Sequence, residues 1–357
     1  MKINDILKTI SIIFFIVLAI FVILEILARY KFKSYYQGSC PYEKFIKNDS
    51  IYVPKKNCKF SVKHWENDKE IVYETDENNN RVSTMPSFFD NDSISIAFFG
   101  DSFTWGDMND VYGNYTHHTA STLKKLVRKK VGYSNYGVPG HDLVQILSRM
   151  KLENLKKYNY IIYGLTPNDI FSPQTYASGR QKNKTLTEAN EEKKSLIKII
   201  TNSFRIHDIR SVKVAGKLFF DIFPKIYTSL YVLRDSNLAG YLSPESSPYW
   251  NERYTELFTQ LKKLNPSIQN RLVIQIIPQR VQVLLFSDKN FERALAFENR
   301  VISICDKLEV KCNRSELSKL SKIKSSHYTI DGHFTSSSNE IVGKSLANFI
   351  FEIPNNN

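Results

Sequence analysis

The residue types that serine-based acyl transfer needs occur in two places far apart in the chain. Ser102 follows an apolar run, Ile96–Phe99, that ends on Gly-Asp. An apolar run of this kind is typical of a buried parallel strand. Open α/β sheets bind ligands at the carboxyl ends of their strands. A serine there is a candidate nucleophile if a base lies within hydrogen-bond reach. His333 is the candidate base, and Asp331 could orient its ring and stabilise the imidazolium.

Two further stretches could supply hydrogen-bond donors to an oxyanion. Gly140 lies in a glycine-containing turn between a short strand and a helix, where its backbone N–H can face developing negative charge. Asn168 follows the next predicted strand and carries a side-chain amide that can donate to the same oxygen. The backbone N–H of Ser102 would be another donor. Taken singly, each stretch is an ordinary turn or helix start.

Taken together and in this order, the stretches around Ser102, Gly140, Asn168 and Asp331–His333 resemble the blocks of the SGNH/GDSL hydrolase superfamily. The resemblance covers roughly residues 94–351. It implies Ser102 as nucleophile, His333 as base and Asp331 as orienting acid. It also implies an oxyanion hole made by Ser102, Gly140 and Asn168.

Two spacings depart from the family pattern. The third block is usually G-x-N-D, whereas Gly164 lies four residues before Asn168. The last block is often D-x-x-H, whereas only Gly332 separates Asp331 from His333. In an extended segment, side chains two positions apart point in opposite directions, so contact requires a turn at Gly332. Without that turn a backbone carbonyl would orient the base.

Four other histidines and one tryptophan near these blocks could have a structural or a functional role. His327 is the alternative base, because it is close to His333 in sequence. His117 and His118 are expected to pack or face solvent, and His141 to start a helix or touch substrate. Trp105 could stack on a sugar ring or fill the core.

The elements that must position these residues alternate between strand and helix from Ile94 onward, which predicts a parallel sheet covered on both faces. The expected fold is a three-layer α/β/α sandwich with a flavodoxin-like sheet, preceded by a single transmembrane helix. The predicted strands are 94–99, 133–136, 160–163, 272–277 and 309–312. The predicted helices are 115–129, 142–156, 248–264, 290–308 and 337–351.

The expected domain division has three parts. Residues 1–29 form a membrane anchor, residues 30–90 a juxtamembrane linker with a small β cap, and residues 91–357 the hydrolase-like domain. Within the cap the pattern predicts a β-hairpin between Ile71 and Ser83. Residues 171–247 are too long for a plain loop. They are expected to form a helical insertion, either a lid or substrate arm or a layer that only packs.

The amino-terminal segment Thr9–Ala28 is just long enough for a bilayer, since about 20 residues span the hydrocarbon core. A cleaved signal peptide is the alternative. Basic residues flank both ends, so charge does not decide the orientation. The cysteine pairs Cys40/Cys58 and Cys305/Cys312 suit two local disulfides in an oxidising compartment, or else four buried thiols. The pairs favour an extracytoplasmic (periplasmic) body.

The net charge of +13 comes from 49 Lys+Arg against 36 Asp+Glu. The basic residues are scattered and accompany no nucleic-acid module, which favours a solvated surface and no nucleic-acid partner. No Cys/His cluster indicates zinc, and no metal or cofactor is expected.

The sequence therefore predicts a membrane-anchored serine esterase or acyltransferase that acts on O-acyl groups, O-acetyl above all. By analogy with anchored members of the superfamily, the substrate is expected to be cell-envelope glycan, with a membrane acyl-donor protein as a possible partner. Two alternatives stay open: a non-catalytic glycan-binding or assembly protein on the same fold, and a lipase- or thioesterase-type hydrolase.

Overall fold

The structure is a computed structural model. It describes residues 3–31, 35–37, 40, 42–45, 48–64, 66–67, 69–90, 92–171, 248–323, 325–328 and 331–353. Apart from residue 171, the predicted insertion at 171–247 lies outside the described residues.

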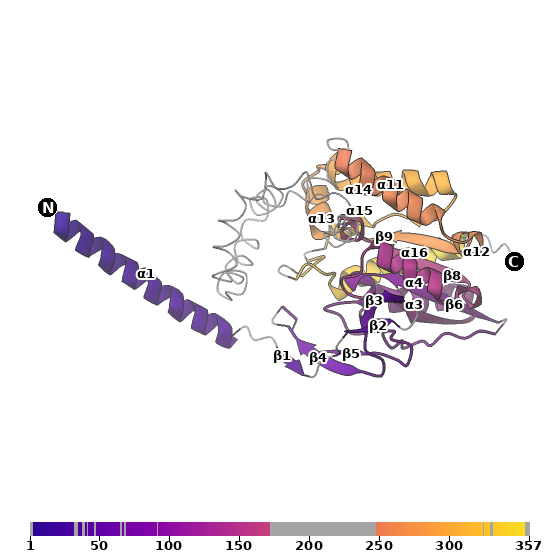
Figure 1. Cartoon of the computed structure of the whole chain (residues 1–357), viewed down its shortest axis with the longest axis horizontal. Coiled ribbons are helices and arrows are strands. Elements are labelled where there is room, and N and C mark those ends of the chain that lie inside the picture. The colour runs from indigo at the N-terminus through magenta and orange to yellow at the C-terminus, as the bar shows by residue number, and fades with distance from the viewer. Residues whose placement is uncertain are drawn as a thin grey trace.

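A five-stranded parallel sheet forms the centre of the main body. Its strands are β6 (Ser93–Gly100), β7 (Lys130–Asn135), β8 (Tyr160–Leu165), β9 (Leu272–Ile276) and β10 (Lys311–Asn313). Their spatial order is β10-β9-β8-β6-β7, with every neighbouring pair parallel (Figure 1). This is the flavodoxin-like order, in which the first strand lies between the second and the third. The predicted fold class is confirmed, and each predicted strand is present.

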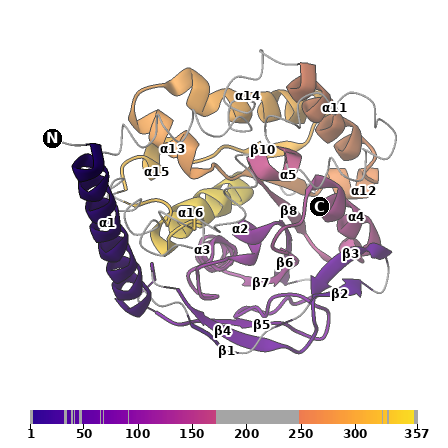
Figure 2. The ribbon, with the colours of Figure 1, turned by 60° about the vertical axis from the view of Figure 1, so that its left-hand side comes forward.

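Helices cover both faces of the sheet, because alternate residues of each strand point to opposite sides. On β6, Ile96 and Phe98 belong to one buried cluster, and Ala97 and Phe99 to the other. The first cluster includes residues of α3 (Tyr115–Val127) and α16 (Ser336–Glu352), which lie side by side in Figure 2. The second includes residues of α4 (Leu143–Leu152), α11 (Pro248–Lys262) and α14 (Phe291–Leu308).

The helices differ from the prediction in two ways. Helix α4 ends at Leu152 rather than at residue 156, because Glu153 takes an extended conformation and a 3-10 turn, η1 (Leu155–Lys157), follows. The short helices were not predicted, since they are too short to show a helical period. They are α2 (Ser102–Trp105), α5 (Pro167–Phe171), α12 (Pro266–Gln269), α13 (Arg280–Ser287) and α15 (Leu317–Leu320).

Residues 35–82, called the cap below, contain two small antiparallel sheets. Strands β1 (Tyr35–Gln37), β4 (Lys59–Lys63) and β5 (Ile71–Glu74) form one, and β2 (Tyr42–Phe45) and β3 (Asn48–Pro54) the other. The predicted hairpin is present as a short antiparallel turn, in which Thr75 bridges Arg81 and the Val82 N–H donates to the Glu74 carbonyl at 2.8 Å. Strand β5 itself pairs with β4, which was not predicted. Within the turn the Asp76 carboxylate accepts the N–H groups of Asn78 and Asn80.

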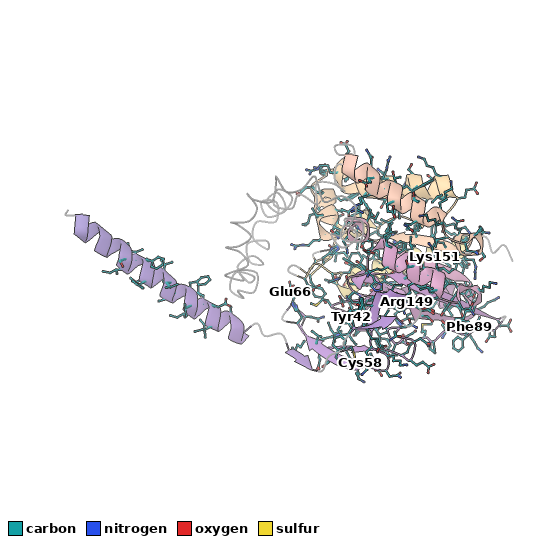
Figure 3. All side chains as sticks on the ribbon, viewed as in Figure 1. Tyr42, Cys58, Glu66, Phe89, Arg149 and Lys151 are labelled. Atoms are coloured by element: carbon teal, nitrogen blue, oxygen red, sulfur yellow. A yellow bond between two sulfur atoms is a disulfide. The ribbon has the colours of Figure 1, made fainter. Side chains whose placement is uncertain are left out.

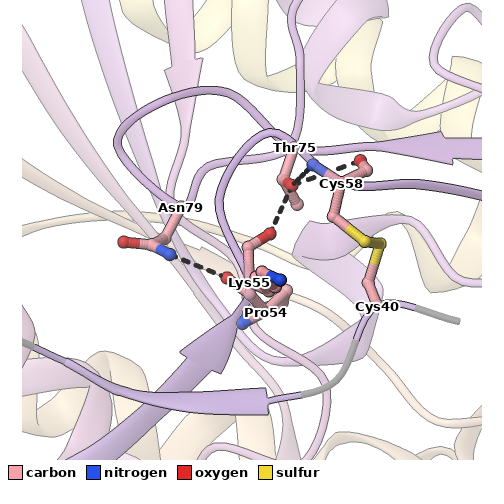
Figure 4. Close-up of a disulfide and its surroundings, with 6 residues drawn as sticks. All are labelled: Cys40, Pro54, Lys55, Cys58, Thr75 and Asn79. Carbon is pink, nitrogen blue, oxygen red and sulfur yellow. Dashed lines mark hydrogen bonds between the residues drawn. A yellow bond between two sulfur atoms is a disulfide. The ribbon is translucent and has the colours of Figure 1, made fainter.

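A disulfide between Cys40 and Cys58 joins the two sheets of the cap (Figure 4). Beside it, the Thr75 hydroxyl donates to the carbonyl of Lys55 at 2.6 Å and accepts the N–H of Cys58 at 2.9 Å. The second disulfide, Cys305–Cys312, connects α14 to β10. Both predicted pairs are bonded.

Helix α1 (Ile3–Lys31) stands apart from the body in Figure 1. Its window Ser11–Ala28 is long and apolar enough to cross a membrane, and a signal sequence has the same character. The large apolar side chains from Ile12 to Leu27 are exposed.

Candidate active site

Ser102 is the first residue of α2, directly beyond the carboxyl end of β6. Asp101 caps this short helix, and its Oδ1 accepts the N–H of Phe103 at 2.9 Å. Gly106 ends the helix in the left-handed region, with φ of 89°. The chain therefore turns sharply on both sides of Ser102 and presents its hydroxyl at the sheet edge.

Ser102, His333 and Asp331 form a continuous hydrogen-bonded chain. Ser102 Oγ lies 2.7 Å from His333 Nε2, although 231 residues separate them in sequence. His333 Nδ1 lies 2.5 Å from Asp331 Oδ1. With the imidazole neutral, Nδ1–H donates to the carboxylate and Nε2 accepts the serine proton. The predicted meeting of these three side chains is present.

A tight turn at Gly332 makes the two-residue spacing of Asp331 and His333 workable. Gly332 has φ of 87°, in the left-handed region that favours glycine. Two backbone hydrogen bonds close the turn. The Tyr328 N–H donates to the His333 carbonyl at 2.8 Å, and the Gly332 N–H donates to the Tyr328 carbonyl at 3.0 Å. The Asp331 carboxylate, rather than a backbone carbonyl, therefore contacts Nδ1 of His333.

Electrostatics favour a protonated imidazole in the free site. Burial alone would lower the pKa of His333, but the hydrogen bond to Asp331 and the carboxylates of Asp107, Asp331 and Asp101 outweigh it. Together they raise the pKa of His333 to about 9. For Asp331, burial acts to raise the pKa, and the contact with His333 outweighs it, so the net pKa is lowered. The base form of His333 is therefore gained as the pH rises toward 9.

Asn168 is held in one orientation by neighbours on both sides of its amide. Its Nδ2 donates to Asp101 Oδ2 at 2.8 Å, and its Oδ1 accepts from Gln279 Nε2 at 2.8 Å. The Thr166 hydroxyl also donates to Asp101 Oδ2, at 3.1 Å. Because Nδ2 carries two hydrogens, one remains for an oxyanion. Gln279 and Thr166 were not predicted, since a Gln before a helix and a Thr in a turn carry no sequence signal of this role.

The other two predicted oxyanion donors are backbone N–H groups. Gly140 is exposed, with φ of 79°. Within the described part of the chain, neither the Gly140 N–H nor the Ser102 N–H has a hydrogen-bond partner. Both are therefore available to an incoming oxygen.

His327 and His141 are buried and make structural contacts. His327 is buried against Phe103 and Phe334, its Nε2 lies 3.2 Å from the carbonyl of Pro278, and burial lowers its pKa to about 3. His327 therefore contacts Pro278 rather than Ser102, which rules it out as the alternative base in this structure. His141 is buried with Nε2 2.7 Å from the carbonyl of Tyr52 in β3, so it fastens the cap.

His117 and His118 lie on α3, away from the hydrogen-bonded chain of Ser102. The His117 ring contacts the hydroxyl of Thr84 at 2.8 Å. Trp105 is buried and stacks on Tyr73 of the cap, with ring centroids 6.1 Å apart. Trp105 therefore packs in the core and also lines a cavity beside the cap.

Arg81 connects the cap to the loop that follows the nucleophile, and sequence reasoning missed it. Its guanidinium is fully buried and donates to the carbonyls of Trp105, Gly106 and Asn109. It also lies over the rings of Tyr73 and Trp105, 4.8 Å and 5.7 Å from their centroids. Arg81 lies in a stretch of polar residues, and nothing in the sequence indicated that its side chain is buried.

Asp107 is a second acidic residue beside His333 that was not predicted. Its Oδ2 lies 3.9 Å from His333 Nε2, and its N–H donates to the Ser102 carbonyl at 3.0 Å. Burial raises the pKa of Asp107 to about 6. A cavity of about 340 Å³ lies next to His333, because the two carboxylates that approach its ring, Asp107 and Asp331, are both in the cavity wall.

The loop between β4 and β5 also contacts the catalytic turn. Glu66 accepts the N–H of Asp331 at 3.0 Å, and Asn67 Nδ2 donates to the Tyr328 hydroxyl at 3.1 Å. Glu66, Tyr42 and Cys58 of the cap lie along one side of the body in Figure 3. The cap is therefore in direct contact with the turn that carries the base.

A parallel α/β/α fold with a Ser–His–Asp chain at the carboxyl edge of its sheet defines a serine hydrolase. Residues 96–342 match the family model of the GDSL-like lipase/acylhydrolases. The chain belongs to this family, and it is a serine hydrolase of the SGNH type that acts on ester bonds.

Similar solved structures include a lipase/acylhydrolase from Enterococcus faecalis, an acetylxylan esterase from Geobacillus stearothermophilus and a putative GDSL-like lipase from Parabacteroides merdae. They are 11%, 10% and 12% identical to this chain, with TM-scores of 0.38, 0.40 and 0.41. The matches cover 72%, 74% and 74% of this chain and 95%, 94% and 98% of theirs. No curated protein sequence matches the chain.

Proposed function

We propose that the protein is a membrane-anchored esterase or acyltransferase that acts on O-acyl groups, O-acetyl above all, of cell-envelope glycan. Ser102, His333 and Asp331 are its catalytic residues, and Ser102, Gly140 and Asn168 its oxyanion hole. The observation that supports the proposal most strongly is the unbroken hydrogen-bonded chain from Ser102 to Asp331.

The reaction proceeds in two halves. Ser102 Oγ attacks the ester carbonyl while His333 Nε2 takes its proton, and Asp331 stabilises the imidazolium. The N–H groups of Ser102 and Gly140 and the amide of Asn168 donate to the oxyanion. His333 then gives the proton to the leaving alcohol oxygen, the C–O bond breaks, and an acyl-serine remains.

In the second half an oxygen nucleophile attacks the acyl-serine and gives its proton to His333. Water as nucleophile releases the carboxylic acid, and a sugar hydroxyl gives a new ester. In both cases His333 returns the proton to Ser102 as the acyl bond breaks. In transfer, the attack of the sugar hydroxyl is the reverse of the step in which the first alcohol left and the acyl-serine formed.

Support for the envelope comes from α1 and the disulfides. Helix α1 is apolar enough to serve as an anchor, and both cysteine pairs of the described chain are bonded. Disulfides persist in oxidising compartments. We therefore assign the catalytic domain to the extracytoplasmic side, facing the glycan of the envelope.

Labelling by a fluorophosphonate probe tests the proposal, since such a probe reacts with an activated serine and needs no known substrate. The full-length protein in detergent should be labelled, whereas Ser102→Ala should not. Ser121→Ala on α3 is the matched control and should label like the wild type. A folded wild type that stays unlabelled would overturn the serine mechanism.

Hydrolysis and transfer are separated by mass. The acyl-enzyme is formed from an acetyl ester and then offered water alone or water with a soluble oligosaccharide. An oligosaccharide heavier by one acetyl group demonstrates transfer, and release of acetate alone demonstrates hydrolysis.

A further inference from the structure

The cavity next to His333 lies between the cap and the loop that follows the nucleophile. Its wall includes four aromatic rings and two carboxylates: Tyr42, Phe60, Tyr73, Trp105, Asp107 and Asp331. A volume of about 340 Å³ is at the small end of ligand pockets. It suits one ring-sized group rather than a long acyl chain.

The geometry of the reaction decides which half of an ester faces this cavity. His333 Nε2 carries the proton that the leaving alcohol oxygen must receive, so the alcohol lies on the Nε2 side of the ring. Asp107 approaches that same nitrogen, at 3.9 Å, and is also part of the cavity wall. The cavity wall therefore includes a carboxylate that approaches the nitrogen from which the leaving alcohol takes its proton.

The Asp107 carboxylate has unused hydrogen-bonding capacity. Among the described residues no hydrogen bond to its side-chain oxygens is formed, and the side chain is 28% exposed. An ionised carboxylate only accepts hydrogen bonds. A ligand that fills this cavity well must therefore bring O–H or N–H donors.

A cationic alcohol would also supply donors or charge, but the cavity disfavours one. The Arg81 guanidinium already lies over the Tyr73 and Trp105 rings that form its inner wall. Its positive charge lowers the attraction that Asp107 exerts on a second cation, and the guanidinium occupies ring faces that would bind one. Neutral hydroxyl groups meet neither obstacle.

We infer that the cap and Asp107 form a binding site for the alcohol half of the ester, and that this alcohol is a neutral ring bearing several hydroxyl groups. Tyr42 and Phe60 pack against the ring, and Asp107 accepts from a hydroxyl next to the esterified one. The inference rests on the proposed function and adds the residues that select the alcohol.

Three acetyl esters test the inference on the full-length protein: a monoacetylated methyl glucoside, cyclohexylmethyl acetate and ethyl acetate. The first two share ring size and differ in hydroxyl groups, and the third lacks a ring. The readout is the ratio of kcat/KM between substrates, so an effect on His333 that is common to all three cancels.

The wild type should favour the glucoside over cyclohexylmethyl acetate. Asp107→Asn should reduce that ratio about tenfold or more, the usual effect of losing a hydrogen bond to a charged group. Asp110→Asn makes the same change on the exposed end of the same loop and should leave the ratio unaltered. Tyr42→Ala should lower kcat/KM for both ring esters relative to ethyl acetate. Tyr42 is half exposed, so its replacement should leave the fold intact.

The inference is overturned if the wild type shows no preference for the glucoside, or if Asp107→Asn leaves the ratio unchanged. A preference for an acetyl ester of a cationic alcohol would overturn it too. Failure of the proposed function looks different, because the wild type would then hydrolyse none of the three esters.

Discussion

The sheet edge and the cap build the same site by different physical means. Ser102 and Asn168 follow the ends of β6 and β8 in a parallel sheet with two apolar cores, and Asp331 and His333 lie in the turn before α16. The cap has small clusters around Tyr73 and Val53, and it attaches through polar contacts from Arg81, His141 and Glu66. The comparison indicates that the sheet supplies the chemistry, while the cap holds the loops and forms the cavity wall.

The largest effect is expected at the sheet edge. Asp331→Asn should lower kcat by ~10³–10⁴, because an amide no longer stabilises the imidazolium and can hold the ring in the wrong tautomer. Steady-state hydrolysis of ethyl acetate measures it, with circular dichroism to check the fold. Asp306→Asn, on α14, is the control. A loss below about tenfold would mean that the base does not depend on its carboxylate.

A smaller effect is expected where the cap meets the nucleophile loop. Arg81→Met leaves three carbonyls of that loop without their donor and should lower the free energy of unfolding by about 3 kcal/mol. Urea denaturation measures the loss. Lys59→Met removes an exposed cap cation paired with Glu74 and should cost under about 1 kcal/mol.

The same pair of variants tests whether the two regions are coupled. If they are, Arg81→Met also lowers kcat, because the loop from Trp105 to Asn109 carries Asp107 and follows Ser102. An unchanged kcat in a destabilised Arg81→Met would show that the cap attaches without affecting the nucleophile loop.

The smallest effect concerns pH. The pKa of His333 is raised to about 9, so kcat/KM should fall as the pH drops below that value. Asp107→Asn removes a negative charge near the ring, which lowers the pKa of His333 and moves the acid limb to lower pH by up to about one unit. On ethyl acetate, activity at pH 7 should therefore rise. For the control Asp110→Asn the acid limb should stay in place. An acid limb that also stays in place for Asp107→Asn would contradict this account.

The sheet could be predicted because β6, β8 and β9 are mainly apolar runs, and because parallel topology brings the carboxyl ends of neighbouring strands together. That placed Ser102 and Asn168 on one edge. The family blocks then indicated His333 as the partner. The contact between Asp331 and His333 depended on the conformation of Gly332, which the sequence permits but does not require.

The contacts around the nucleophile loop could not be predicted in the same way. Arg81 of the cap donates to backbone carbonyls, Asp107 lines a cavity, and Gln279 donates to the amide of Asn168. Each of these contacts depends on the packing of segments far apart in sequence. The β4–β5 pairing was missed because β4 carries only a short alternating pattern. The catalytic roles of the site residues and the domain boundaries remain predictions.

The turn from Tyr328 to His333 has a further consequence. Because the acid and the base are only two residues apart on one closed turn, they move as a unit, and a shift of that turn would separate His333 from Ser102 without disturbing Asp331. The activity then depends on one distance, the distance between this turn and Ser102. Glu66 and Asn67 hold the turn from outside, so the cap contributes to that distance together with the Asn109 contact to Phe334.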